Sequence, residues 1–160
     1  MNRSIINIDT SPIGKGRERT CYILPDDTTK IVKISGNETN TQTQREIAFY
    51  RTIKNKKDFN YAQLPRFYGL CNTNLGEGFI VDLVQDYNGE VSKSLRWYLN
   101  QGHPLAEYEN LLTDLRTYLL EQLIIINHDM VPGNLLLQKL SSKNSRLVLI
   151  DGIGDVVAIR

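Results

Sequence analysis

The pattern of apolar residues changes near the middle of the chain, and this change constrains the possible folds most. Before about residue 86, short apolar and β-branched runs alternate as strands do, at 5–7, 20–24, 29–34 and 78–84. After it, apolar residues recur at helical spacing over 94–100 and 108–126, followed by two short β-type runs at 135–137 and 147–150. The sequence therefore predicts an α+β chain with a sheet-rich part at about 1–85 and a helical part at about 90–160, within one domain spanning 1–160.

Two local features refine the first part of this prediction. The turn sequence Pro25–Thr28 separates two β-branched runs and predicts a hairpin. A helix is expected over 44–53, where Ile47, Tyr50 and Ile53 are spaced for one helical face. The turn sequence Asp86–Gly89 marks the expected boundary between the two parts.

Composition limits the classes of function. The chain has 160 residues, 41% of them hydrophobic and 23% charged, which suits one folded domain. A net charge of +1 gives no electrostatic reason to expect nucleic acid or a membrane surface as partner. The one basic cluster, at 54–57, reads first as a solvated helix end.

The cysteines and the longest apolar run point to the same cellular setting. Cys21 and Cys71 do not form a metal-binding pair, and they are interpreted as reduced thiols. The longest apolar run, around 123–126, is far shorter than a membrane span. A cytoplasmic location is the resulting expectation.

Glycines at 14 and 16 lie between two predicted strands, in the stretch Ser11–Arg17. Glycine lets a backbone approach an anion closely, so this stretch is a candidate for phosphate binding. The spacing alone is weak evidence, because two glycines one residue apart occur in many ordinary turns. Arg19 stands where a third glycine would complete a phosphate-binding loop.

Lys33 lies inside an apolar strand and points to the opposite face from Val32 and Ile34. It therefore faces either water, as an ordinary strand lysine such as Lys30 would, or a cleft. The helix that follows carries Glu46 among apolar neighbours, and such a carboxylate could hold a lysine toward phosphate. The competing acid, Glu38, lies in the polar connection between strand and helix.

The stretch 126–137 carries the strongest signal, because an acid and an amide flank a turn between a helix and a strand. Asp129 could accept or orient a hydroxyl proton, and Asn134 could offer an oxygen to Mg²⁺. Pro132 and Gly133 keep the intervening backbone non-helical. The alternative for Asp129 is a residue of a helix C-terminal turn, where the helix dipole disfavours an acid.

A second acid, Asp151, ends an apolar run and is followed at once by Gly152. An aspartate at the end of a buried strand is well placed to ligate Mg²⁺. The alternative is a plain Asp-Gly turn.

Together these motifs resemble the protein-kinase-like superfamily over nearly the whole chain. The stretches Ile13–Gly16, Ile31–Ile34 and Asn127–Asn134 are similar to the glycine-rich loop, the lysine strand and the catalytic loop, and Asp151-Gly152 is similar to the metal-binding motif. The opening Ser11–Tyr22, with Arg45–Tyr50 and Leu64–Gly69, resembles more closely the bacterial YrbL family of PhoP regulatory network proteins.

The resemblance implies a kinase-like two-lobed fold with ATP and Mg²⁺ as cofactors. The nucleotide would be contacted by Ile13, Gly14, Gly16, Lys33 and Val84. The implied catalytic residues are Asp129, Lys33 and Glu46, and the implied metal ligands are Asn134 and Asp151.

Two departures from the kinase pattern shape the expected function. Val131 stands where protein Ser/Thr kinases carry a catalytic-loop lysine, and only nine residues, 152–160, follow Asp151, which implies a reduced C-terminal lobe. The first hypothesis is an ATP-dependent phosphotransferase acting on a protein Ser/Thr or a small hydroxylated acceptor. The second is a pseudokinase-type regulatory module that binds nucleotide and acts through a protein partner.

Overall fold

The computed structural model describes residues 4–16, 18–36, 41–126 and 130–154. The chain divides into two compact units, the first formed by Met1–Gln44 and Arg66–Leu83, the second by Arg45–Pro65 and Val84–Arg160.

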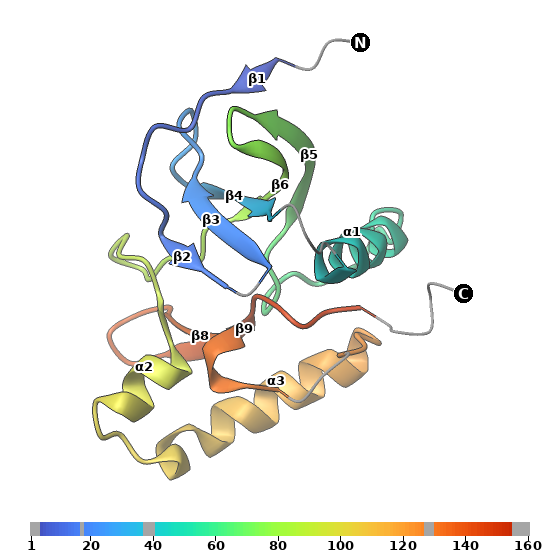
Figure 1. The fold of residues 1–160 in the computed structure, drawn as a ribbon. Helices are drawn as coiled ribbons and strands as arrows, with labels where there is room; N and C mark the ends of the chain where they lie inside the picture. Colours follow the sequence, from blue (N-terminus) through green and yellow to red (C-terminus); the bar gives the residue numbers. More distant parts are fainter. Residues whose placement is uncertain (1–3, 17, 37–40, 127–129, 155–160) are drawn as a thin grey trace. The chain divides into compact units, whose positions relative to one another are not determined.

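The first unit is built around a six-stranded sheet (Figure 1). Its strands are β1 (Ile5–Ile6), β2 (Gly14–Lys15), β3 (Arg19–Ile23), β4 (Lys30–Ser35), β5 (Phe67–Thr73) and β6 (Gly76–Asp82), in the spatial order β1-β5-β6-β4-β3-β2. Neighbouring strands are antiparallel except β1 and β5, which pair in parallel. The hairpin predicted at Pro25–Thr28 is the β3–β4 connection.

One face of this sheet carries the apolar core of the first unit. The register pairs Tyr22 with Val32 and Val32 with Ile80, so these three side chains share a face. The buried members of the core are Ile8, Leu24, Val32, Ile34 and Cys71. Because side chains alternate along each strand, the opposite face carries Cys21, Lys33 and Phe79.

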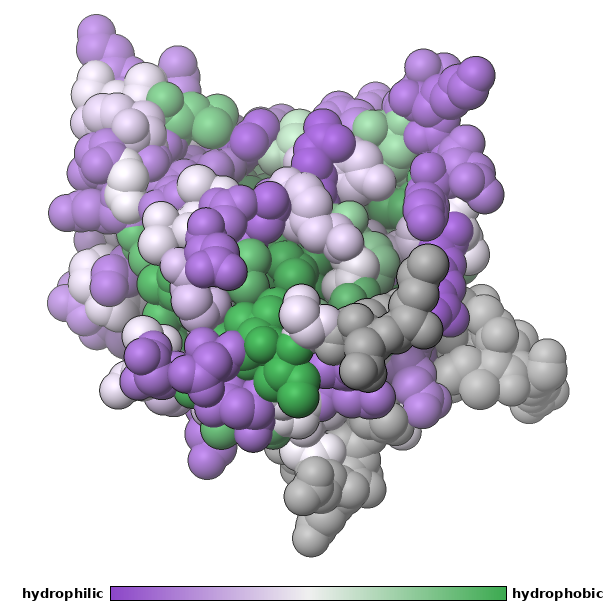
Figure 2. Space-filling view, turned by 90° about the horizontal axis from the view of Figure 1, so that it is seen from above, coloured by the Kyte–Doolittle hydropathy of each residue, from purple (hydrophilic) through white to green (hydrophobic). Residues whose placement is uncertain are grey.

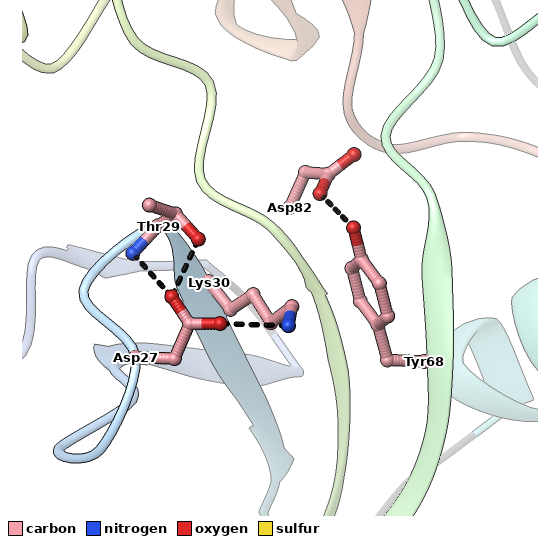
Figure 3. Close-up of polar contacts among 5 residues, drawn as sticks. All are labelled: Asp27, Thr29, Lys30, Tyr68 and Asp82. Atoms are coloured by element: carbon pink, nitrogen blue, oxygen red, sulfur yellow. Dashed lines mark hydrogen bonds and ion pairs between the residues drawn. The ribbon is translucent and has the colours of Figure 1, made fainter.

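A β-bulge in β5 lies beside Tyr68, whose side chain joins a polar cluster at the start of β4 and the end of β6 (Figure 3). The Tyr68 hydroxyl donates to Asp82 Oδ1 at 2.6 Å, and Lys30 Nζ lies 4.3 Å from the centre of the Tyr68 ring. The same lysine pairs with Asp27 Oδ2 at 2.7 Å, and Asp27 also accepts the Thr29 N–H. Lys30 is thus engaged at the start of β4 by Asp27 and Tyr68, which is a structural role.

The second unit combines helices with a smaller sheet (Figure 1). Its elements are most of α1 (Thr41–Ile53), β7 (Lys93–Ser94), α2 (Leu95–Asn100), a 3₁₀ turn (Leu105–Tyr108), α3 (Glu109–Glu121), a second 3₁₀ turn (Pro132–Asn134), β8 (Leu135–Lys139) and β9 (Ser145–Leu149). The strands are antiparallel in the order β7-β8-β9, and α3 packs on β9. Leu115 of α3 and Leu147 and Leu149 of β9 are fully buried in this core.

The segment 45–65 clusters with the second unit, although the sequence pattern suggested a sheet-rich part running to about 85. Polar contacts explain the difference. The Gln63 carbonyl accepts from the Leu149 N–H at 3.0 Å, and Gln63 Nε2 donates to the Leu147 carbonyl at 3.1 Å. The Tyr118 hydroxyl of α3 donates to the Asn60 carbonyl. This part of the chain therefore lines the edge of β9 and the side of α3.

The long helix expected to run to residue 126 ends at Glu121. Leu123 adopts a positive φ of 56°, and the Ile124 N–H donates back to the Leu119 carbonyl at 2.9 Å. This is a Schellman termination, in which the position usually held by glycine is occupied by Leu123. Apolar periodicity continues past this residue, so the pattern overestimated the helix length.

The surface combines apolar and polar areas. Figure 2 shows a central apolar patch with hydrophilic residues around it, and smaller apolar areas toward the margins of the view. Exposed large apolar side chains of the first unit include Ile5, Leu70 and Leu75. Exposed apolar side chains are usual on folded proteins, so these alone assign no partner. Within the described ranges, no helix has both the length and the apolar character needed to cross a membrane.

Candidate functional site

The glycine stretch forms a hairpin arm at the edge of the first sheet. Gly14 of β2 pairs with Cys21 of β3, and the Ile13 N–H donates to the Cys21 carbonyl at 2.9 Å. A Cβ atom built on Gly14 would meet nothing within 4 Å, and one on Gly16 would lie an ordinary 3.6 Å from the Arg19 carbonyl oxygen. Packing within the described residues therefore does not require glycine at either position, and space remains beside the Gly14 backbone.

Lys33 lies on the same row of the sheet as Gly14. The register pairs Gly14 with Cys21, Cys21 with Lys33 and Lys33 with Phe79. Paired residues project to the same face, and two strand spacings separate Gly14 from Lys33 by about 10 Å. The glycine arm and the lysine thus belong to one face of the first unit.

Lys33 is buried, with 5% of its surface exposed, and its Nζ lies 5.6 Å from the centre of the Phe79 ring. The alternative of an ordinary solvent-exposed strand lysine is therefore wrong. Lysine is rarely buried to this extent unless its charge is balanced by a partner or by an aromatic face.

Arg19 is a second buried cation on this face, and sequence reasoning missed it. Its guanidinium carbon lies 5.7 Å from the centre of the same Phe79 ring. Arg19 is two residues before Cys21 on β3, so both side chains point to the face of Lys33. The only sequence signal was that Arg19 stands where a third glycine would complete the loop. A single basic residue at such a position does not indicate that its side chain is buried.

In the second unit, the structure brings Asn134 and Asp151 to the same end of the β8–β9 hairpin. Leu135 pairs with Leu149, and the Ile150 N–H donates to the Asn134 carbonyl at 3.0 Å. A Cβ atom on Gly152, whose φ is +79°, would lie 3.7 Å from Asn134 Nδ2. Asp151 Oδ1 accepts the Gly152 N–H at 2.8 Å, which orients the carboxylate.

The turn before Asn134 is fixed by its packing against α2. Pro132 begins the 3₁₀ turn, and the Asn134 N–H donates to the Val131 carbonyl at 3.0 Å. A Cβ atom on Gly133 would lie 3.1 Å from the guanidinium carbon of the exposed Arg96, so a larger residue there would shift the end of this side chain slightly. The sequence predicted a non-helical course here, whereas the structure forms a 3₁₀ turn over Pro132–Asn134.

The residues after Asp151 pack against α1, the helix that carries Glu46. The Gly154 N–H donates to the Ile125 carbonyl at 3.0 Å, and a Cβ atom on Gly154 would lie only 2.8 Å from the Arg45 carbonyl oxygen. Glu46, the next residue along, is fully buried at 0% exposure. The backbone thus joins the Asp151 turn to the part of α1 that holds the predicted acid.

Of the remaining predicted residues, the structure describes Val84 but not the acids at 129 and 38. Val84 is buried, and its carbonyl accepts the Ser92 N–H at 3.1 Å. Asp129 and the competing acid Glu38 lie outside the described residues.

The donor chemistry of the second unit fits Mg²⁺ bound together with phosphate oxygens. Asn134 and Asp151 would offer oxygen atoms from adjacent turns, the ligand type that hard cations prefer. The described residues contain no group of three or more His, Cys, Asp or Glu side chains able to hold a metal ion by themselves. Two protein ligands are a usual number for Mg²⁺ where substrate phosphates complete its coordination.

Solved structures similar to this chain are protein kinase domains. The PknI kinase domain of Mycobacterium tuberculosis matches with a TM-score of 0.60 at 13% sequence identity, over 88% of this chain. A cysteine-to-alanine mutant of the same domain matches with the same values. The chain spans 57% of that kinase domain. At this identity the likeness shows the fold alone, so the chain has a kinase-like α+β fold.

Sequence relatives point to a narrower group. The YrbL proteins of Escherichia coli K12 and of Shigella flexneri are each 29% identical to it over 158 residues, which is 94% of this chain and 74% of theirs. Residues 5–160 match the family described as PhoP regulatory network protein YrbL. The chain therefore belongs to the YrbL family of PhoP regulatory network proteins, and its structure is kinase-like.

Proposed function

We propose that this protein binds ATP with Mg²⁺ and transfers the γ-phosphate to a hydroxyl group of a protein Ser/Thr or of a small acceptor. The observation that carries the proposal is the row from Gly14 to Lys33 on one sheet face. In this row, the Gly14 backbone has open space beside it, and Lys33 contributes a buried ammonium group. Phosphoryl transfer depends mainly on positioning and on charge stabilisation, and these are the groups that supply both.

In this proposal each residue of the first unit has one task. The backbone around Gly14 and Gly16 approaches the phosphates, Ile13 contacts the nucleotide, and Lys33 neutralises phosphate charge. Burial strengthens the electrostatic effect of Lys33, because the surroundings of a buried charge screen it less than water does. Arg19, on the same face, adds to the positive potential there.

The second unit supplies the groups for metal binding and proton transfer. Asn134 and Asp151 would hold Mg²⁺, which neutralises charge that develops on the transferred phosphate. Glu46 would hold the Lys33 ammonium in place, and Val84 would contact the nucleotide. Asp129 would accept the proton of the acceptor hydroxyl as its oxygen bonds to the γ-phosphorus and the bond to the ADP oxygen breaks.

The second candidate is a nucleotide-binding regulatory module that acts through a protein partner. Val131 favours it, because a lysine that handles the γ-phosphate in Ser/Thr kinases is absent at this position. An acid such as Asp129 favours the enzyme, since a module that only binds nucleotide has no hydroxyl to activate.

Incubation with γ-labelled ATP and Mg²⁺ separates the two candidates. The enzyme predicts label transfer to an acceptor, to the protein itself or to water, and loss of this transfer in Asp129→Ala while ATP binding persists. Asp114→Ala, at an exposed position of α3, is the matched control. Binding of ATP with no transfer above the Asp129→Ala level would support the regulatory module and contradict the enzyme.

A further inference from the structure

A cavity of about 680 Å³ lies in the second unit, and none of the residues assigned above to ATP or Mg²⁺ lines it. It is bounded by the turn that contains Asp86, Glu90 and Val91, by the start of α2, and by Lys139 at the end of β8. Its volume falls in the range typical of small-molecule sites.

The turn that forms one wall is held firmly. Asp86 is buried, and its Oδ1 accepts from the Ser92 hydroxyl at 2.6 Å and from the Lys139 N–H at 3.0 Å. The Tyr87 N–H donates to the Lys139 carbonyl at 2.8 Å, and Gln85 forms a bridge with Val91. A wall fixed by these bonds does not have to be ordered when a ligand binds, which favours binding.

Aromatic side chains form another part of the lining. Trp97 and Tyr98 meet edge to face at 5.0 Å between ring centres, and His103 meets Tyr98 in the same way at 5.7 Å. His103 is held in turn by Glu107, with 3.2 Å between Nδ1 and Oε2. Trp97 remains 42% exposed, so part of its ring is available to a ligand.

Two lysine ammonium groups lie over these rings. Lys93 Nζ is 5.8 Å from the centre of the Trp97 ring, and Lys139 Nζ is 6.0 Å from that of Tyr98. The lining also carries two acids, Asp86 and Glu90, so its formal charges balance. The Asp86 carboxylate is buried in the turn and accepts its two hydrogen bonds there, whereas the two ammonium groups are the charges that lie over the rings. An organic cation would have to displace the lysines from the rings, whereas an anion would be attracted by both.

We infer that this cavity binds a small organic anion that carries a carboxylate or a phosphate on a flat ring. The ring would rest on Trp97, and the anionic group would lie between the ammonium groups of Lys93 and Lys139. The inference does not depend on the proposed nucleotide site, because none of the residues invoked here is assigned to it.

Trp97 is the only tryptophan of the chain, so its fluorescence reports directly on this cavity. We expect phenyl phosphate, added without nucleotide, to change the Trp97 emission in a saturable manner. Benzylamine matches the ring but carries the opposite charge, and it should produce no saturable change. Inorganic phosphate has the charge without the ring, and it should bind at least about tenfold more weakly than phenyl phosphate, because the ring contact with Trp97 is lost.

Variants at the lysines test the assigned contacts. Lys93→Gln and Lys139→Gln keep the backbone bonds and should each weaken phenyl phosphate binding about tenfold, the loss expected for one hydrogen bond to a charged group. Lys143→Gln, an exposed lysine of the β8–β9 turn, should leave it unchanged. The inference is overturned if phenyl phosphate gives no saturable signal, if benzylamine or inorganic phosphate binds equally well, or if the Lys143 variant weakens binding as much as the other two.

Discussion

Gly14 and Gly78 lie in the same sheet, but a side chain would meet different surroundings at each. A Cβ atom on Gly78 would lie 2.6 Å from the Lys33 carbonyl oxygen and 3.0 Å from Val32 Cγ1, so the backbone of β4 would have to move. At Gly14 there is open space. Packing therefore requires glycine at position 78, whereas the space beside Gly14 is available to an approaching ligand.

We expect Gly78→Ala to lower the free energy of unfolding by about 2 kcal/mol, as overpacking does. Gly14→Ala should change it by less than about 0.5 kcal/mol but should weaken ATP binding, because the new methyl group occupies the space proposed for phosphate. Chemical denaturation and calorimetry measure the two effects. Unchanged ATP affinity in Gly14→Ala would contradict the role given to this strand.

At the scale of single residues, the sequence predicted which side chains could bind phosphate better than it predicted which of them are buried. Alternation along the strand correctly separated Lys33 from Val32 and Ile34, but it could not decide between water and interior. That depends on pairing with β3 and β6, which brings Phe79 beside the lysine. Arg19 was missed for the same reason.

Among the secondary-structure elements, α3 ends at a residue whose backbone conformation is strained. Leu123 holds a left-handed conformation although 77% of its surface is exposed, so little packing offsets the strain. A left-handed non-glycine residue costs about 1–2 kcal/mol. Local periodicity could not predict this end, since Leu123 and its neighbours continue the apolar pattern.

Leu123→Gly should therefore stabilise the protein by about 0.5–1 kcal/mol, because the relief of strain exceeds the added entropy of the unfolded chain. Leu120→Gly, at an exposed position inside the helix, should destabilise it by a similar amount. Denaturant unfolding of both variants is the measurement. If Leu123→Gly proves as destabilising as Leu120→Gly, the proposed strain is absent.

The bulge in β5 gives a second prediction at this scale. Partial desolvation of the ring, with the hydrogen bond to Asp82, raises the pKa of Tyr68 to about 12. Because the folded-state pKa exceeds the unfolded value, the stabilisation from the neutral hydroxyl is complete below about pH 10. It is lost as the pH rises toward 12.

Tyr68→Phe should lower the free energy of unfolding by about 1 kcal/mol at neutral pH, the usual loss for one hydrogen bond. The difference between wild type and variant should shrink above about pH 10. Unfolding measured across this range tests both statements. A difference that grows with pH would show that the ionised tyrosine is the form that the fold favours.

For the whole molecule, the order of strands and helices was predictable, and the grouping of segments was not. The switch from strand-like to helical periodicity near residue 86 lies close to the point, between Leu83 and Val84, where the chain passes from the first unit to the second. The assignment of 45–65 to the second unit depends on contacts of Gln63 and Asn60 with distant residues, and no local pattern reports these. The proximity of Asn134 and Asp151 was predictable, because Asn134 precedes the first strand of a hairpin and Asp151 follows the second.

The central claim is that the chain binds ATP together with Mg²⁺, and calorimetric titration with ATP, with and without Mg²⁺, tests it most directly. We expect wild type to bind ATP more tightly with Mg²⁺, Lys33→Met to weaken binding about tenfold or more, and Asp151→Asn to abolish the Mg²⁺ dependence. Lys30→Met and Asp114→Asn, which change charges outside the proposed site, should behave as wild type. Absence of ATP binding by wild type under both conditions would contradict the account.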